Sequence, residues 1–142
     1  MAWIFRLLAL FTSWTKLKSS VAQTKESVNQ VSRAASGIQQ KHTQESFEKA
    51  LGGDLNAAYD LGERHYDGRG LPQDYQQAAQ WFARAANLGH PKAQTTLGLM
   101  FLAGRGVRKN PTKARELLVA AAKQGDSKAK ETLEKLNQAA RR

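Results

Sequence analysis

The sequence contains no cysteine, which excludes disulfide bridges, thiolate metal sites and cysteine nucleophiles. Its three histidines, His42, His65 and His90, show no i, i+4 pairing, so a metal site on a helix is not expected. No G-x-S-x-G nucleophile elbow occurs, and the carboxylates form no paired acid–base arrangement. We therefore expect a protein that is not an enzyme, with no catalytic residue, no cofactor and no metal ion.

Acidic residues are also scarce. Twelve Asp and Glu residues stand against 22 Lys and Arg residues, and the formal net charge is +10. A basic surface favours an acidic protein partner, anionic lipid or nucleic acid. No nucleic-acid-binding motif or base-stacking platform accompanies this charge, so nucleic acid is not the preferred partner. A basic nucleic-acid- or ribosome-associated accessory protein remains the alternative interpretation.

A repeat of 36 residues organises the second part of the chain. Ten residues of one segment recur 36 positions later: Ala57, Leu61, Gly62, Gly68, Arg69, Gly70, Ala78, Ala85, Ala86 and Gly89 become Ala93, Leu97, Gly98, Gly104, Arg105, Gly106, Ala114, Ala121, Ala122 and Gly125. A fixed period of this length indicates a repeat array, and such arrays mostly bind other macromolecules.

Each repeat is predicted to contain two helices. Asp54, His90 and Asp126 occupy N-cap positions for the first helix of successive copies. Asp74 and Asn110 do the same for the second helix. The Gly-Arg-Gly tripeptide between the helices can supply the positive φ angles of a helix–helix turn.

Two further glycines are expected inside the first helices. Gly62 and Gly98 each interrupt a helical pattern, at a cost of about 1 kcal/mol in helix propensity. Their recurrence at the same place predicts close packing against alanines of the second helix.

The pattern A-x3-LG-x5-G-x-G-[LV]-x2-[DN]-x3-A-x2-[WL]-x3-AA-x2-G resembles the Sel1-like repeat, a relative of the tetratricopeptide repeat. The resemblance implies an all-α fold, a short α-solenoid of helix pairs. It divides residues 41–142 into a degenerate half-repeat 41–56, repeats 57–92 and 93–128, and a C-terminal capping helix 129–142. It also implies a scaffold or adaptor that binds proteins.

Residues 1–40 carry a different pattern. From Trp3 to Ile38, apolar residues are spaced alternately by four and three over five heptads, with Thr24 the one polar member. This spacing predicts one long amphipathic helix with a coiled-coil-like seam, ending near Gly37. The seam could also join two chains.

The tip of this helix is predicted to be an anchor. Residues 1–11 are almost entirely apolar, but a membrane-spanning helix needs about 20 apolar residues, so a full span is disfavoured. A cleaved secretory signal and a mitochondrial presequence are alternatives. The preferred interpretation is an uncleaved helix that docks on a membrane surface or in a protein groove. The candidate anchor residues are Trp3, Ile4, Leu7, Leu8, Phe11 and Trp14.

These features together predict a non-enzymatic scaffold, an accessory subunit docked to a membrane or membrane complex through residues 1–17. The expected localisation is peripheral at a membrane, with a mitochondrial or a periplasmic or secreted location as alternatives. The resemblance implies that the first helix of each repeat lines the concave face. The candidate partner-binding residues are Tyr59, Asp60, Glu63, Arg64, Thr95, Thr96, Leu99 and Met100. Leu99 and Met100 stand out because their counterparts, Glu63 and Arg64, are charged.

Overall fold

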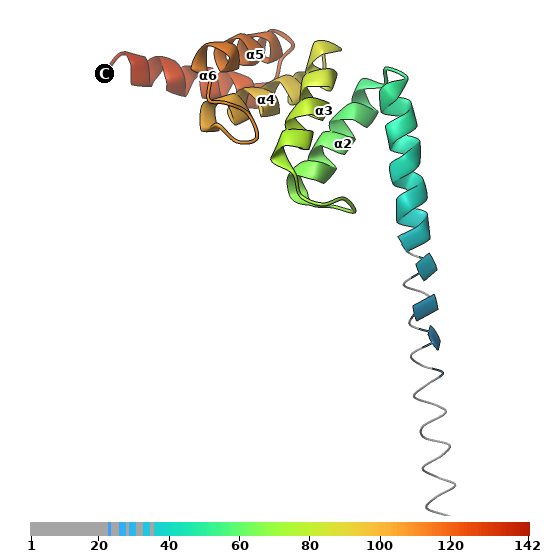
Figure 1. Cartoon of the computed structure of the whole chain (residues 1–142). Coiled ribbons are helices and arrows are strands. Elements are labelled where there is room, and N and C mark those ends of the chain that lie inside the picture. The colour runs from blue at the N-terminus through green and yellow to red at the C-terminus, as the bar shows by residue number, and fades with distance from the viewer. Residues whose placement is uncertain (1–22, 24–25, 28, 31–32, 35) are drawn as a thin grey trace, which may run out of the picture. The chain divides into compact units, whose positions relative to one another are not determined.

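A computed structural model describes residues 23, 26–27, 29–30, 33–34 and 36–142. The chain divides into two units, Met1–Gln40 and Lys41–Arg142 (Figure 1). The described residues of the first unit are helical and exposed. Residues 36–51 form a helical run that contains Gly37, and Gly37 has no positive φ. The prediction that the helix ends near Gly37 is therefore wrong, because one helical glycine costs only about 1 kcal/mol and does not stop a helix by itself.

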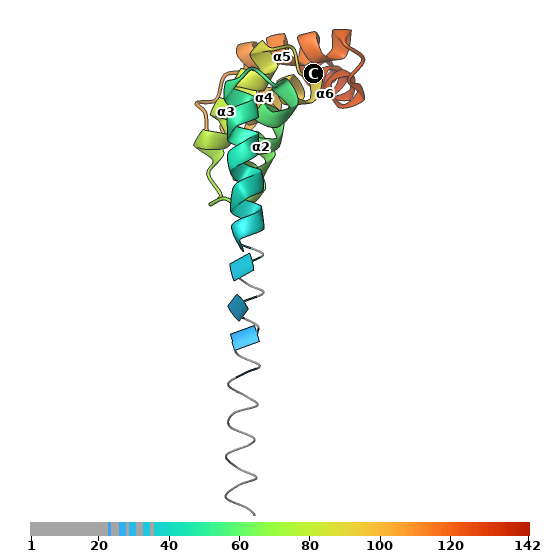
Figure 2. The ribbon, with the colours of Figure 1, turned by 90° about the vertical axis from the view of Figure 1, so that its right-hand side faces the viewer.

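The second unit is built from helices in contact with their neighbours in sequence. After residues 41–51, the helices are α2 (Leu55–Asp67), α3 (Tyr75–Asn87), α4 (Pro91–Ala103), α5 (Pro111–Lys123) and α6 (Ser127–Ala140). Contacts join α2 to α3, α3 to α4, α4 to α5 and α5 to α6 (Figures 1 and 2). No strand occurs in the part of the chain that the structure describes. The predicted all-α fold, a short solenoid of helix pairs, is confirmed.

The helices begin where the sequence predicts. Asp54 Oδ1 accepts hydrogen bonds from the backbone N–H groups of Asn56 and Ala57 at 2.9 and 3.0 Å. At the equivalent position before α4, His90 Nδ1 accepts from the Ala93 N–H at 3.2 Å. Asp126, Asp74 and Asn110 cap α6, α3 and α5 in the same way. These caps satisfy N–H groups that have no partner inside the helix.

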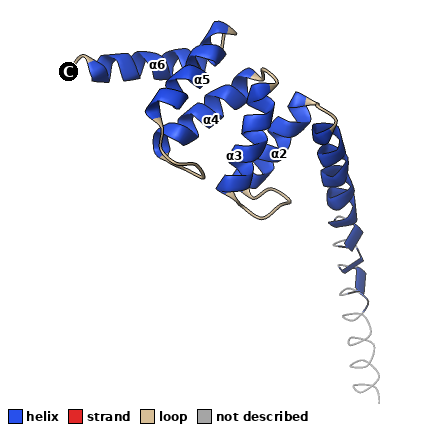
Figure 3. Cartoon of the chain, turned by 45° about the horizontal axis from the view of Figure 1, so that its top comes forward, coloured by secondary structure: helices blue, strands red, loops and turns tan. Residues whose placement is uncertain are grey.

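The two Gly-Arg-Gly turns have the same geometry. Gly68 and Gly104 end α2 and α4 in the left-handed region, with φ of 73° and 67°. Each loop is closed by a hydrogen bond from the following N-cap residue: the Asp74 N–H donates to the His65 carbonyl, and the Asn110 N–H to the Phe101 carbonyl. In Figure 3 they are the long tan connections that follow α2 and α4. The repeat is therefore a repeat of backbone conformation as well as of sequence.

The core is made of alanines packed around a few large side chains. Phe82, Leu61 and Leu118 are the largest fully buried residues. A Cβ atom at Gly62 would lie 2.6 Å from the Phe82 ring, and one at Gly98 would lie 3.0 Å from Leu118 Cγ. The predicted close approach is present, but the side chains that occupy it are mainly Phe82 and Leu118 and not alanines. Each glycine makes room for the largest core residue of the helix that follows it.

Single helices cover both ends of the stack. At the start, Ala50 is buried and the Phe47 ring packs edge-on against Trp81 with centroids 5.4 Å apart. At the other end, Ala129 is buried and Leu133 packs against the cluster around Leu118. Residues 41–51 thus pack against the first helix pair, α2 and α3, and α6 packs against the cluster around Leu118 at the other end.

Candidate protein-binding pocket

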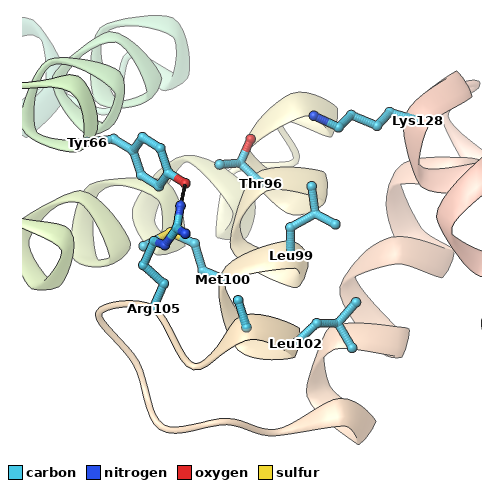
Figure 4. Close-up of a pocket in the computed structure, with 8 residues that line it drawn as sticks. Tyr66, Thr96, Leu99, Met100, Leu102, Arg105 and Lys128 are labelled. Carbon is cyan, nitrogen blue, oxygen red and sulfur yellow. Dashed lines mark hydrogen bonds between the residues drawn. The ribbon is translucent and has the colours of Figure 1, made fainter.

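An open pocket of about 530 Å³ is lined by residues of α2, α4, α6 and the loop that follows α4. We call it the α4 pocket, because α4 supplies most of its lining. The residues that line it are Tyr66, Thr96, Leu99, Met100, Leu102, Ala103, Arg105 and Lys128. Figure 4 shows Tyr66 and Arg105 on one side, Lys128 on the other, and Thr96 and Leu99 between them.

The floor of the α4 pocket is apolar because α4 has apolar residues on every side. Leu97 and Met100 are buried in the core, whereas Leu99 and Leu102 are only half-buried. A helix that is hydrophobic all round is normally buried all round. Here part of that surface remains open to solvent as the floor of a pocket.

One rim of the pocket carries a cation held by aromatic rings. Arg105 Nη1 donates a hydrogen bond to the Tyr66 hydroxyl at 2.6 Å. The guanidinium carbon lies 5.9 Å from the Tyr66 ring centroid and 5.3 Å from that of Tyr75, distances at which a ring face attracts a cation. The hydrogen bond to Tyr66 raises the pKa of Arg105 above its ordinary value. An arginine is always charged in proteins, and this one lies against two rings of the preceding repeat.

The loop that carries Arg105 is fixed closely to the same neighbour. Gly106 lies against the backbone of Tyr75 and has a φ of 70°, so a side chain there would meet both strain and a clash. The Gly-Arg-Gly loop of the second repeat thus docks on the first repeat, and this docking holds the guanidinium at the pocket rim.

The structure brings only some of the predicted contact residues of α4 to this pocket. Thr96 and Leu99 line it and are half-buried. Met100 is 2% exposed and Thr95 is 3% exposed. Thr95 therefore cannot serve as a contact residue, and Met100 contributes only to the floor. The resemblance implied that both are non-core residues of the concave face, but both are buried.

The predicted contact residues of α2 are bound within the chain. The Tyr59 hydroxyl donates to Glu63 Oε1 at 2.9 Å, and the Tyr59 ring stacks on His90 with centroids 4.5 Å apart. Burial, followed by the neighbouring Glu63 carboxylate, raises the pKa of Tyr59 to about 12. Asp60 and Arg64 form an ion pair at 2.8 Å. These four residues do not line the α4 pocket, and they form two pairs within α2.

Arg64 makes a further connection inside the second unit. Its Nη2 lies 2.9 Å from His42 Nδ1, and its Nη1 donates to the Thr43 hydroxyl at 3.4 Å. This side chain therefore joins α2 to the helix formed by residues 41–51. A role in packing is shown directly by these contacts.

The candidate anchor residues Trp3, Ile4, Leu7, Leu8, Phe11 and Trp14 lie outside the described residues. Within the described residues, no helix has the length and apolar character needed to cross a membrane. The same part of the chain holds no cluster of three or more His, Asp or Glu side chains that could bind a metal ion.

Sequence reasoning missed five residues of the α4 pocket: Tyr66, Leu102, Ala103, Arg105 and Lys128. A signal for two of them was present in the comparison of the two repeats, since Tyr66 and Asp67 of one copy correspond to Leu102 and Ala103 of the next. The sequence shows that positions 99 and 103 lack the charges of Glu63 and Asp67. Only the structure shows that Arg105 consequently contacts Tyr66 and not a carboxylate.

The chain was compared with known families and structures. The family model of the Sel1 repeat matches residues 55–90 and 91–126, which begin two residues before the units derived from the sequence pattern. A Sel1 repeat protein from Oxalobacter formigenes is 36% identical, with a TM-score of 0.63 over 64% of this chain and 26% of that chain.

Two other solved structures are similar. Cysteine-rich protein B of Helicobacter pylori is 27% identical, with a TM-score of 0.63 over 66% of this chain and 70% of that chain. A protective antigen present in uropathogenic Escherichia coli strains, described as displaying an SLR fold, is 30% identical, with a TM-score of 0.58 over 68% of this chain and 24% of that chain. This chain thus spans about a quarter of the length of the Oxalobacter and Escherichia proteins.

Proposed function

Because this chain belongs to the Sel1 repeat family, we propose that it is a non-enzymatic adaptor that holds a protein partner in the α4 pocket. Sel1 repeat proteins are generally scaffolds for protein interactions, and their fold is typically non-catalytic. The observation that carries the proposal is the open apolar floor of α4, at Leu99 and Leu102. An apolar patch left open on a repeat stack is typical of a protein-interaction surface.

The test is recovery of a partner that depends on this surface. The full-length chain, tagged at its C-terminus, is used to capture proteins from native membranes, which are identified by mass spectrometry. We expect at least one protein to bind the unaltered chain and to be lost with Leu102→Lys, and to be retained with Val119→Lys, a change on the exposed face of α5. If every captured protein binds both variants equally, the α4 pocket is not the binding surface.

The salt dependence of capture separates this proposal from the nucleic-acid alternative. Binding to phosphates releases counterions, so it weakens steeply as salt is raised. Binding to the apolar floor of the pocket should change little. Loss of all binding partners after nuclease treatment would support the alternative, for which the net charge of +10 is the favouring observation.

The second part of the proposal is that residues 1–17 dock the adaptor to a membrane surface, with a peripheral localisation. Its support is the sequence pattern: an almost entirely apolar tip followed by Lys16 and Lys18. Six large apolar side chains, each contributing about 1.5–3 kcal/mol on burial, can outweigh the cost of ordering a helix.

Flotation with anionic liposomes tests the anchor. The unaltered chain should float with the liposomes, and Leu7→Asp combined with Phe11→Asp should leave it in the soluble fraction as a monomer. Light scattering serves as the control for self-association through the seam. An unaltered chain that stays off liposomes and forms a dimer in detergent-free buffer would contradict the anchor and support the paired seam.

A further inference from the structure

The arginines at equivalent positions of the two repeats, Arg69 and Arg105, contact different kinds of side chain. In the first repeat, Arg69 lies 3.0 Å from an oxygen of Asp67 and 3.8 Å from an oxygen of Glu63. In the second repeat, Arg105 stands at the equivalent position. It has no carboxylate partner among the residues that the structure describes, and it contacts the hydroxyl and rings of tyrosines.

Two sequence differences account for this change. The positions of Glu63 and Asp67 are occupied by Leu99 and Ala103 in the second repeat. Both replacements lie in the α4 pocket. They remove the acids that would neutralise the arginine, and they make the floor beside it apolar. A free cation and an apolar surface therefore arise together, at one place, from the same two positions.

The opposite rim carries a second available cation. Lys128, in the first turn of α6, is exposed and lines the pocket. No ion pair involves Lys128 within the described part of the chain. Glu131 is one turn away, but its carboxylate is already held by Lys135 at 2.6 Å. The pocket thus presents an apolar floor between two cations (Figure 4).

We propose that the α4 pocket binds an acidic peptide segment of a partner protein, in which a large apolar side chain lies close to an Asp or Glu residue. The apolar side chain packs on Leu99 and Leu102, and the carboxylate pairs with Arg105 or Lys128. Arginine held in one position favours a carboxylate, because little freedom is lost when the charge-assisted hydrogen bonds form. This inference rests on the proposed adaptor function and specifies the chemistry of its ligand.

A protein segment fits this pocket better than nucleic acid does. Phosphates need a row of cations, whereas the other residues that line the pocket, Thr96, Leu99, Met100, Leu102 and Ala103, carry no charge. The Tyr66 ring, which could stack on a base, is engaged by the Arg105 guanidinium. The pocket therefore favours a ligand that buries an apolar side chain and carries a single negative charge beside it.

The experiment uses the full-length chain and a displayed library of random peptides. Peptides that bind are sequenced, synthesised with a fluorescent label and titrated by fluorescence polarisation. We expect the selected peptides to share an apolar residue within a few positions of Asp or Glu. Replacing that acid with its amide, or the apolar residue with serine, should weaken binding about tenfold or more. Enrichment of basic or uncharged peptides, or of none, would overturn the inference.

Variants of the chain then locate the site. Leu99→Glu with Ala103→Asp restores the carboxylates of the first repeat, and we expect it to abolish binding of the selected peptides. Val119→Glu with Ala139→Asp is the matched control, since it makes the same change in net charge at exposed positions of α5 and α6 outside the pocket. Equal loss of affinity in both double variants would show a general charge effect and overturn the assignment to the pocket.

A single substitution at the rim tests the site with less risk of unfolding the chain. Arg105→Gln keeps a hydrogen-bond donor for Tyr66 and removes the charge, and we expect about tenfold weaker binding of the acidic peptides. Unchanged affinity in this variant would contradict the inference, as would displacement of the peptide by a single-stranded oligonucleotide. If a native partner is captured by the unaltered chain and still binds the variant Leu99→Glu with Ala103→Asp, the proposed ligand of the α4 pocket is wrong while the adaptor function stands. If the unaltered chain captures no protein at all, the adaptor function itself fails.

Discussion

At the scale of single residues, His90 makes one helix cap sensitive to pH. The other caps of the labelled helices are Asp or Asn side chains, whereas α4 is capped by the imidazole nitrogen Nδ1 of His90. This nitrogen can accept the Ala93 N–H bond only when it carries no proton. Burial, and secondarily the nearby Lys92, lower the pKa of His90 below its ordinary value of 6.5. The folded state therefore favours neutral His90.

We expect the stability of the unaltered chain to fall as pH decreases below 6.5. In the interval between the lowered native pKa and 6.5, the unfolded chain binds more protons at this residue than the folded chain, so stability rises with pH there. His90→Asn supplies a cap that does not titrate, as Asn110 does for α5. Thermal unfolding of both proteins between pH 5 and pH 8 should show a smaller pH dependence in the variant. Equal slopes would contradict the prediction.

Gly62 is predicted to be required for packing. Alanine at this position should gain about 1 kcal/mol of helix propensity. Its Cβ would lie 2.6 Å from the ring of Phe82, which is 1% exposed. Overpacking of this kind costs about 1–3 kcal/mol, so we expect a net loss of stability in denaturant-induced unfolding.

A matched pair of variants checks this interpretation. Gly37→Ala places the same methyl group in a helix where no atom apart from the neighbouring backbone lies within 4 Å, so it should leave stability unchanged or slightly raised. Gly98→Ala should fall between the two, because its nearest contact is the longer 3.0 Å to Leu118 Cγ. If Gly62→Ala is as stable as Gly37→Ala, Phe82 can adjust and the glycine is not needed.

At the scale of elements, α6 differs from α2 and α4 at the position of the glycine inside the helix. Its Leu133 corresponds to the core residues Leu61 and Leu97 and packs against Leu118. Glu134, however, stands where Gly62 and Gly98 allow close approach of the next helix, and it is exposed. A glutamate at this position gives α6 a polar side chain where Gly62 lets Phe82 approach α2. Terminal elements of solenoids commonly have such a polar outer face.

Leu133→Ala should therefore destabilise the stack from its C-terminal end. We expect a loss of about 2 kcal/mol in urea unfolding, at the low end for leucine truncation because Leu133 is only half-buried. Lys130→Ala, an exposed position on the same helix, is the control and should have no measurable effect. Equal stability of the two variants would mean that α6 is not part of the cooperative unit.

At the scale of the whole molecule, the second unit contains the core that the structure describes. Buried residues within the described part of the chain run from Thr43 to Ala129, so all of them lie in Lys41–Arg142. Deletion of residues 1–17 should therefore leave a folded protein with the same cooperative thermal transition. Far-UV circular dichroism measures this, and an unfolded truncated chain would show that the tip completes the core.

The repeat architecture could be predicted in detail because its signals are local. Asp54, Asp74 and Asp126 cap their helices through N–H groups two or three residues away. Gly68 and Gly104 end helices by their own φ angles. The prediction that Gly37 ends a helix was wrong because a glycine stops a helix only where the following residues form a turn. The residues after Gly37 continue the helix instead.

The sequence by itself thus determined the period, the helix ends within the two repeats, the positions of the close contacts and the family of the fold. The tertiary structure alone decided that Phe82 fills the space beside Gly62, that Thr95 and Met100 are buried, and that Asp60 and Arg64 pair with each other. It also decided that Arg105 rests on Tyr66, 39 residues away, at the rim of an apolar pocket. Caps and turns depend on neighbours in sequence, whereas burial and the pairing of charges depend on which helices meet.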